Sequence, residues 1–593
     1  MNRPEIFSPD WGSESRQLWS VVLAARNGSL RSKLSSLLAQ LDIDHCNADQ
    51  LRVGFSTSLL LDVLDAGGQA WVSDSRLFVS WPDWNGDVGR DAIKRAMHSA
   101  RDLRPLTERE IERILPLFAG DIDGDTVARV LEHGTFRLVS VDNSHPTGIP
   151  YKKAFAAALR YWSMPYRGRT GRMRRFVMTA QHPDLGRHPK IAGILELGDE
   201  APFCRWRDDL LGLSPSSFKD WLRAQKTSSR FKEIAGASAE RLRSIRSCLL
   251  PTNDGRNLAR LSAKSILARQ EEIEQAARGR SLVAEHELDG LRDRKRLSYG
   301  VRLARGEAAL LRLAHQGPEL LLSSWDVELD RDLGAGVRAL HDILVPRLHL
   351  EATICGAVPP FSEALGGKLL ISFFTHPAII QAPLHGERKL LGWSFDLTKL
   401  DRHLPNHGML CLTTKGLYQG HAPMYNRSAA PGQSSAIRMR HLGNTGGHTT
   451  TLLSNRTAKF AWRFLDAIES VDQRVSTVYG SGGSKRHRAI ESAAVLVGIS
   501  KSLTMAGIQR PVYGMEFVHN AIEVCWLGSE PNWRVEHYDD EDAFCTAATA
   551  FWRDRWLQRA AARIHEFAIA PSFGGELNQQ LNHAGKHREL VDT

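Results

Sequence analysis

Three consecutive residues, Gly366, Gly367 and Lys368, have the types and the setting of an anion-binding turn. Apolar residues and two prolines precede them, and an apolar run over residues 369–374 follows. That order predicts a strand, a constrained turn and a helix whose first backbone amides have no partner within the helix. Amides of this kind bind anions such as phosphate. The sequence therefore indicates a cofactor-binding turn, with tight packing of the helix against the strand as the alternative role of the glycines.

A second candidate site is the loop that contains Tyr425 and Asn426, which follows an expected strand over residues 408–414. A phenol can act as a general acid that returns a proton to a leaving thiolate. Asn426 adds a hydrogen-bonding amide beside it. We therefore predict catalytic roles for both residues. The alternative is that the Tyr425 hydroxyl is buried and only fixes the loop.

Paired acids form a third group of candidates. Asp208 is followed by Asp209, Asp326 lies near two further acids, and residues 539–540 are both aspartate. Carboxylate oxygens are the ligands that Mg²⁺ prefers, and such pairs support phosphoryl chemistry in nucleases. The same residues also serve as helix caps and surface charges. A metal-dependent nuclease that uses Asp208 or Asp326 is therefore an alternative, and we assign no metal ligands.

Common catalytic signatures are absent from the sequence. It contains no G-x-x-x-x-G-K-[ST], no G-x-S-x-G, no H-E-x-x-H and no protein-kinase motif set. ATP hydrolysis and zinc proteolysis are therefore not indicated. A glycine-rich stretch over residues 440–447 is a weak indication of phosphate binding.

Basic residues gather in three clusters, and the formal net charge is +10 with a pI of about 9.3. The middle cluster, residues 292–296, is expected on the charged face of a helix. Cations beside aromatic rings can neutralise phosphates and stack on bases, which predicts nucleic-acid binding. Solvated ion pairs or a helix-capping loop are the alternatives. The predicted contacts in the first and third clusters are Arg167, Arg169, Arg172, Arg174, Arg175, Lys485, Arg486 and Arg488.

Length and composition describe a multidomain globular protein. With 593 residues and 42% apolar content, the chain can bury several cores, and two to four domains are expected. The longest apolar run, residues 369–374, is far shorter than the roughly 18 residues that span a membrane. The first residues lack the pattern of a secretory signal. Seven widely spaced cysteines without a C-x-x-C pair indicate reduced thiols. We therefore expect a cytoplasmic protein.

Hydrophobic periodicity predicts alternating strands and helices, which favours an α/β core. A hairpin is expected over residues 69–80, and residues 93–135 have a helical pattern. The other expected strands cover residues 176–180, 191–197, 319–327, 350–358 and 408–414. The other expected helices cover residues 30–41, 58–64, 151–162, 240–248, 258–277, 334–344, 365–374, 459–470, 488–497 and 541–567.

Four units are expected along the chain. Residues 1–95 form a small N-terminal α/β unit, and residues 96–165 form a helical region. Residues 166–460 form the α/β core, with a helical insertion over residues 236–315. Residues 461–593 form a helical C-terminal region.

Four features occur in a fixed order along the chain. They are Gly193-Ile-Leu-Glu-Leu-Gly198 with Arg207-Asp208, Gly356-Ala-Val-Pro-Pro-Phe-Ser with Leu365-Gly-Gly-Lys-Leu369, Thr413-Thr414 with Leu417-Tyr418, and Tyr425-Asn-Arg427. Together they resemble the DruA-like family of Druantia anti-phage defence proteins of bacteria. The resemblance extends from about residue 50 to residue 560 and includes the hairpin and the late Trp552-Arg-Asp-Arg-Trp556.

The resemblance implies a defence role, usually alongside partner proteins, and a mixed-sheet core similar to the GNAT acetyltransferase superfamily. In that fold a strand, a tight turn and a helix N-terminus hold the pyrophosphate of acyl-CoA, and here residues 359–368 take that place. GNAT proteins usually carry an Arg or Gln before G-x-G or G-x-A in this turn, whereas this chain reads Ala364-Leu-Gly366-Gly367. A degenerate fold used for recognition is therefore an open alternative.

The functional prediction is a DruA-like defence protein that binds or acts on phage nucleic acid through its basic clusters. One alternative is an acyl-CoA-dependent N-acyltransferase in which Gly366, Gly367 and Lys368 contact the pyrophosphate and Tyr425 is the acid. The other is the metal nuclease. The sequence leaves open whether the chain is catalytic.

Overall fold

The structure is a computed structural model of the chain. It describes residues 5–7, 30–73, 76–84, 93, 107–120, 122–159, 173–199, 204–225, 227–249, 262–268, 287–322, 326–365, 367–381, 408–416, 423–446, 452–468, 485–505, 507–538 and 540–566.

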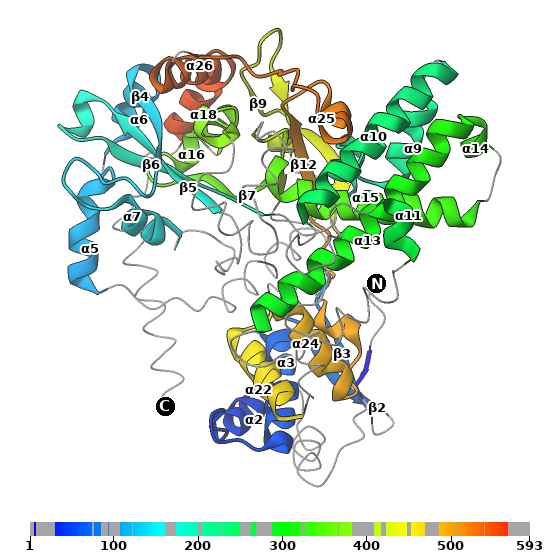
Figure 1. Ribbon diagram of the computed structural model, residues 1–593. Helices are drawn as coiled ribbons and strands as arrows, with labels where there is room; N and C mark the ends of the chain where they lie inside the picture. The colour runs from blue at the N-terminus through cyan, green and yellow to red at the C-terminus, as the bar shows by residue number, and fades with distance from the viewer. Residues whose placement is uncertain are drawn as a thin grey trace.

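A seven-stranded mixed sheet forms the centre of the molecule, which confirms the predicted α/β class (Figure 1). Neighbouring strands are antiparallel except for one parallel pair, β7 and β8. The strands expected over residues 176–180, 191–197, 350–358 and 408–414 are confirmed. In spatial order the strands are β11 (Arg440–Asn444), β12 (Pro511–Glu516), β8 (Cys411–Lys415), β7 (His349–Ala357), β6 (Lys190–Gly198), β5 (Met173–Gln181) and β4 (Thr135–Ser140).

One face of the sheet is covered by helices from the middle and the end of the chain, with α26 running over the top in Figure 1. Alternation along the strands places Phe176, Leu195 and Leu350 in the same core as Trp552 of α26. The covering helices are α6 (Gly124–His133), α16 (Ser362–Leu365), α17 (Lys368–Ser372), α18 (Pro377–Ile380) and α26 (Glu541–Glu566). The helix expected over residues 541–567 is therefore confirmed.

Two further cores flank the sheet. Near β5 and β6, the helices α5 (Glu108–Ile114) and α7 (Tyr151–Ala158), with the 3-10 turn η1 (Leu115–Leu117), pack on Val177 and Ile194. The second core is a helical bundle on the right of Figure 1. Its helices include α8 (Arg205–Leu210), α9 (Pro215–Arg223), α10 (Ser228–Leu249), α13 (Glu287–Gln316), α14 (Glu319–Leu322), α15 (Val327–Leu348) and α25 (Ala521–Leu527), and the short α11 (Ala263–Ala268) lies against α13.

The strand expected over residues 319–327 is wrong. Residues 319–322 form α14, and α15 begins at Val327. Asp326 caps α15, because its side chain accepts a hydrogen bond from the backbone amide of Leu329 at 3.0 Å. A run of leucines followed by Trp325 has the composition of a buried strand, but periodicity cannot distinguish such a short run from a helix.

A second lobe combines two distant parts of the sequence. The described residues between 30 and 93 share one hydrophobic core with the described residues between 452 and 508, although the second segment lies between β11 and β12 along the chain. Ser58 Oγ lies 2.7 Å from Thr457 Oγ1, and the Trp81 indole donates to the Leu503 carbonyl at 3.0 Å. The elements, at the bottom of Figure 1, are β1 (Glu5–Phe7), α2 (Leu30–Ala39), α3 (Ala48–Asp65), β2 (Gln69–Ser73), β3 (Arg76–Ser80), α22 (Asn455–Ile468), α24 (Lys485–Leu496) and η6 (Lys501–Thr504).

This lobe shows how tertiary contacts extend a predicted helix. The sequence pattern predicts a helix over residues 58–64 only, whereas α3 begins at Ala48 after a capping box in which Asn47 and Gln50 bond each other's backbone amides. Ser56 and Thr57 interrupt the apolar pattern but are buried. The expected unit boundaries stay predictions, and the cores group residues 30–93 with residues 452–508.

No helix among the described ranges is long and apolar enough to cross a membrane.

Candidate functional site

A pocket lined by arginines lies at the β11 edge of the central sheet. Its volume is about 580 Å³. The walls come from α21 (Pro423–Asn426), the hairpin of β9 (Ala429–Ala430) and β10 (Ile437–Arg438), the start of β11, and residue 534. The lining residues are Asn426, Ser435, Ala436, Arg438, Met439, Arg440, His441 and Arg534.

Strand alternation presents two of these arginines on the same open side. Ile437 and Met439 are buried in the sheet core, whereas Arg438 and Arg440 are exposed. Successive side chains of extended backbone point in opposite directions, so one apolar pair fills the core while one basic pair lines the pocket.

A third arginine reaches the pocket from a distant part of the chain. Arg534 Nη1 donates to Glu516 at 3.1 Å, and Arg440 Nη1 lies 3.9 Å from the other oxygen of that carboxylate. The backbone of Arg534 is fixed by a bond from its amide to the Phe517 carbonyl at 2.8 Å. Two guanidinium groups therefore share one carboxylate, while the third, Arg438, lines the same pocket. A guanidinium presents a planar set of donors that matches phosphate oxygens, so the excess positive charge favours a phosphate ligand.

Aromatic rings connect the pocket to the predicted catalytic loop. The His441 and Tyr513 rings are 5.4 Å apart, and Tyr513 lies 4.9 Å from Tyr425. Burial raises the pKa of the Tyr425 phenol, and Cys355 raises it further, so the phenol is protonated at neutral pH. Asn426 lines the pocket while Tyr425 packs behind it. This placement fits the role of a buried hydroxyl, and the role of general acid stays a prediction.

The glycine turn lies on the same side of the sheet as Tyr425 but does not line this pocket. Gly366 lies outside the described residues. Gly367 has φ 81°, a left-handed conformation that glycine adopts without strain, and α17 starts at the next residue. The Lys368 ammonium lies 3.9 Å from the centre of the Trp556 ring. A backbone turn of the expected kind is present, and the lysine that would contact phosphate lies against an indole of α26.

Asp208 belongs to a buried ion network between α8 and α15. Its carboxylate accepts from Arg207 Nε at 2.8 Å and lies 3.1 Å from His341 Nε2. His341 Nδ1 lies 3.1 Å from Asp342. Burial disfavours a charged imidazole, but the hydrogen bonds to Asp208 and Asp342 outweigh it and raise the pKa of His341.

Metal binding gains no geometric support from these acids. Asp326 caps α15 and also pairs with Arg312 at 2.6 Å. Within the described ranges, His, Cys, Asp and Glu form no group of three or more that could hold a metal ion. Asp539 lies outside the described residues.

Several arginines of the predicted nucleic-acid clusters bind the protein itself. Arg174 is buried and donates to the Ile379 carbonyl at 2.6 Å, and Arg175 donates to Glu196 at 2.8 Å. Arg486 donates to the Leu453 and Ser454 carbonyls at 2.6 and 2.7 Å. Burial lowers the pKa of Arg488. Arg167, Arg169, Arg172 and the side chain of Lys485 lie outside the described residues.

The sequence interpretation missed Arg438 and Arg534. The alternation of Ile437, Arg438, Met439 and Arg440 is a visible signal of an edge strand with one basic side. No signal links Arg534 to this strand, because it is 94 positions from Arg440 and reaches the pocket only through β12 and the loop that follows.

The fold and the pocket define an α/β protein with an arginine-lined cavity at one sheet edge. No protein family model matches the chain, and no solved structure matches it. The chain is similar to the Druantia protein DruA of Escherichia coli (strain UMEA 4076-1), with 24% identity over 225 residues. The match covers 37% of this chain and 50% of the relative, so the chain spans about half the length of the curated relative that it matches. This distant similarity supports the resemblance noted in the sequence.

Proposed function

We propose that this chain is an anti-phage defence protein of the DruA-like type and that it binds nucleic acid at the arginine pocket. The similarity to DruA supports the defence role. On this proposal the protein acts in the cytoplasm and, as the resemblance implies, alongside other proteins of a defence system. The observation that carries the nucleic-acid part is the convergence of Arg438, Arg440 and Arg534 on one cavity.

The chemistry of the pocket suits a phosphodiester backbone. Three guanidiniums can donate to phosphate oxygens, while the Asn426 amide and the Ser435 hydroxyl can bond sugar or phosphate groups. Strand β11 is at the end of the strand order, so a long polymer can pass the pocket without entering the core. Backbone contacts of this kind position nucleic acid without reading its sequence. We therefore expect binding with little sequence preference.

Salt titration of binding tests this proposal. The affinity of the full-length chain for duplex and single-stranded DNA is measured by fluorescence anisotropy at several salt concentrations. Substituting Arg438→Gln and Arg440→Gln together should lower the slope of log affinity against log salt by about 1.8 for duplex DNA, because each phosphate that is no longer neutralised lowers it by about 0.9.

The matched control is Arg223→Gln with Arg230→Gln. These arginines on α9 and α10 are also exposed, and they pair with Asp220 and Glu233. The control should keep the wild-type slope. The proposal fails if the pocket variant keeps the wild-type slope, or if control and pocket variants change equally.

An acyl-CoA-dependent acyltransferase is the second candidate. The observation that favours it is the left-handed turn at Gly367 directly before α17, which follows β7 after the short helix α16. The resemblance to GNAT proteins implies a strand, a tight turn and a helix N-terminus in that order. Gly366, Gly367 and Lys368 would contact the pyrophosphate, and the raised pKa of Tyr425 keeps its proton available. The backbone turn fits this role, while Lys368 would have to leave Trp556.

Thermal unfolding with and without CoA tests the second candidate. A ligand that binds only the folded state at 100 times its Kd stabilises it by about 2.7 kcal/mol. Gly367→Val should abolish any increase in melting temperature, because a β-branched residue is strained at positive φ.

The nuclease alternative predicts DNA cleavage that EDTA and Asp208→Asn both abolish. The geometry does not favour the nuclease alternative, because the Asp208 carboxylate is already bonded to Arg207 and His341.

A further inference from the structure

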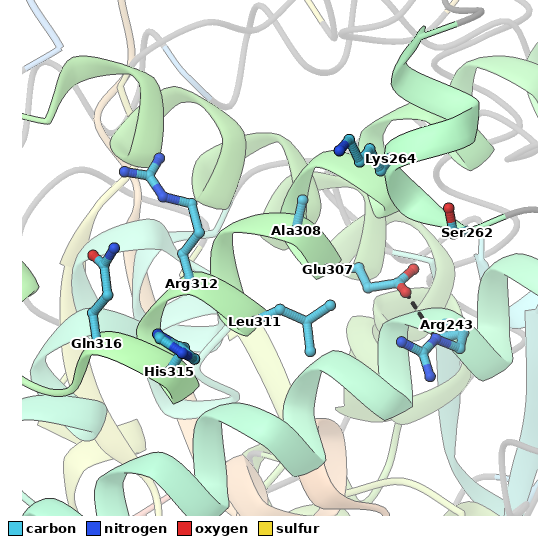
Figure 2. A pocket seen from close by; sticks show the side chains of 9 residues that line it. All are labelled: Arg243, Ser262, Lys264, Glu307, Ala308, Leu311, Arg312, His315 and Gln316. Atoms are coloured by element: carbon cyan, nitrogen blue, oxygen red, sulfur yellow. Dashed lines mark hydrogen bonds and ion pairs between the residues drawn. The ribbon is translucent and has the colours of Figure 1, made fainter.

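A second cavity lies in the helical bundle, on elements that do not contribute to the arginine pocket. Its volume is about 390 Å³, and it opens between α10, the start of α11 and the last turns of α13 (Figure 2). Cavities that bind small molecules usually have volumes of roughly 300–1,000 Å³. The cavity therefore has the size of a small-ligand site.

The wall formed by α13 is apolar. Ala308 and Leu311 lie three residues apart on this helix and face the cavity in Figure 2. Leu311 is 39% exposed, whereas most large hydrophobic side chains of the described residues are buried. An exposed leucine on the wall of a concave site can contact the apolar part of a ligand.

The floor of the cavity carries a buried ion network. Glu307 is 1% exposed and accepts from Arg243 Nε at 2.8 Å and from Arg246 Nη2 at 2.9 Å. One carboxylate therefore serves two guanidiniums. Glu240 also pairs with Arg243, but from the solvent side, where water and salt weaken the interaction. The two guanidinium groups neutralise the Glu307 carboxylate, so it repels an anion only weakly.

Two more cations stand at the rim. Arg312 on α13 pairs with Asp326 at 2.6 Å, while Lys264 on α11 is exposed and has no ion-pair partner among the residues that the structure describes. Among the described residues at or next to the cavity, the positive groups are Arg243, Arg246, Arg312 and Lys264, and the negative groups are Glu307, Glu240 and Asp326. These described charges leave an excess of one positive charge, and Lys264 carries it at the rim.

We propose that this cavity binds a small amphiphilic monoanion, with an apolar body against Leu311 and Ala308 and one carboxylate, sulfonate or phosphate group on Lys264. The apolar wall comes from α13, and the cation comes from α11 (Figure 2). A polyanion would need several unpaired cations, and a neutral ligand would leave Lys264 unused. An acyl carboxylate and a cyclic nucleoside monophosphate each carry one negative charge and share the required chemistry.

Fluorescence of 8-anilinonaphthalene-1-sulfonate with the full-length protein tests the proposal, because this probe is a flat apolar monoanion. Saturable binding is expected. Lys264→Ala should weaken it about tenfold, the loss expected for one charge-assisted hydrogen bond. Leu311→Asp should weaken it at least as much, because it removes apolar contact and adds a repelling charge. Leu311 is partly exposed, so we expect the variant to fold, and circular dichroism checks this.

The matched controls are Lys459→Ala and Leu496→Asp on the second lobe. Lys459 is exposed on α22, and Leu496 is 52% exposed on α24. Both controls should bind the probe as wild type does. Decanoate and 3′,5′-cyclic AMP, both monoanions, then compete with the probe, and the stronger competitor identifies the apolar body as an acyl chain or as a base. An affinity unchanged in Lys264→Ala, equal losses in the controls, or displacement by neither competitor would overturn the proposal.

Discussion

Glu516 holds Arg534 at 3.1 Å on the wall of the arginine pocket and is shared with Arg440 at 3.9 Å. This carboxylate reduces the positive charge that a phosphate would meet. It also fixes the direction in which both guanidiniums point.

We expect Glu516→Gln to strengthen nucleic-acid binding. The glutamine keeps an oxygen that can accept from Arg534, and one negative charge disappears from the pocket. The gain should be about two- to fivefold at low salt, corresponding to the ~0.5–1 kcal/mol of a partly exposed ion pair. Fluorescence anisotropy measures it. Glu233→Gln, which removes an exposed acid on α10, should leave affinity unchanged. Weaker binding by the Glu516 variant would argue against a phosphate ligand in the pocket.

The close crossing of α13 and α15 predicts that one added methyl group lowers the stability of the protein. A Cβ added at Gly306 would lie 2.6 Å from the Cα of Gly336, so the helices would have to separate. Gly306→Ala should therefore lower the free energy of unfolding by about 1–3 kcal/mol. Gly236→Ala on α10 is the control, because a Cβ there meets nothing within 4 Å. It should raise stability by about 0.5–1 kcal/mol. Urea unfolding measures both, and equal effects would contradict the close crossing.

The Asp208–His341 network predicts a dependence of stability on pH. The pKa of His341 is raised in the folded state, so the folded chain holds this proton more tightly than the unfolded chain. Its contribution is complete below about pH 6.5, the unfolded pKa, and is lost as pH rises through the folded pKa. Urea unfolding of wild type should show stability falling over that window. His341→Gln should reduce the fall, while His133→Gln at an exposed site should not.

Asp62 should give the second lobe its own pH dependence. Burial raises its pKa to about 6, although it accepts from the Ser454 amide at 2.8 Å and from Thr457 at 2.5 Å. The folded lobe therefore favours the protonated acid. The stabilisation of the folded lobe by protonated Asp62 is complete below about pH 3.9, the unfolded pKa, and is lost as pH rises through about 6. In Asp62→Asn the melting temperature should change less between about pH 3.9 and pH 6 than it does in wild type, and thermal unfolding measures this. The control is Asp44→Asn, whose side chain is exposed, and an unchanged profile in Asp62→Asn would count against a buried acid.

Most elements of the sheet could be predicted from local sequence. The strands β5 to β8 alternate or run apolar, and the long helices α10, α15 and α26 carry clear helical patterns. Failures occurred where short apolar runs are ambiguous, as at residues 319–327, or where buried polar residues interrupt the apolar pattern. Ser56 and Thr57 are examples, since both are buried in α3 outside the helix that the pattern predicts.

The candidate site could be predicted only in part. Asn426 and Arg440 were visible in the sequence as members of polar or glycine-rich loops, and Asn426 does line the arginine pocket. The composition of the basic clusters could not show that Arg174 and Arg486 bind backbone carbonyls within the protein. An arginine in a loop and an arginine that ties two segments together have the same local sequence.

The sequence by itself determined the α/β class and the net positive charge and indicated a constrained turn at Gly366 and Gly367, because these follow from residue types and their local spacing. Only the tertiary structure decided which cations face solvent, which acids are paired, and that Arg438, Arg440 and Arg534 share a cavity. The reason is physical. The environment of a charged side chain depends on residues from distant parts of the chain. Burial of apolar surface determines the fold and therefore which of these residues become neighbours.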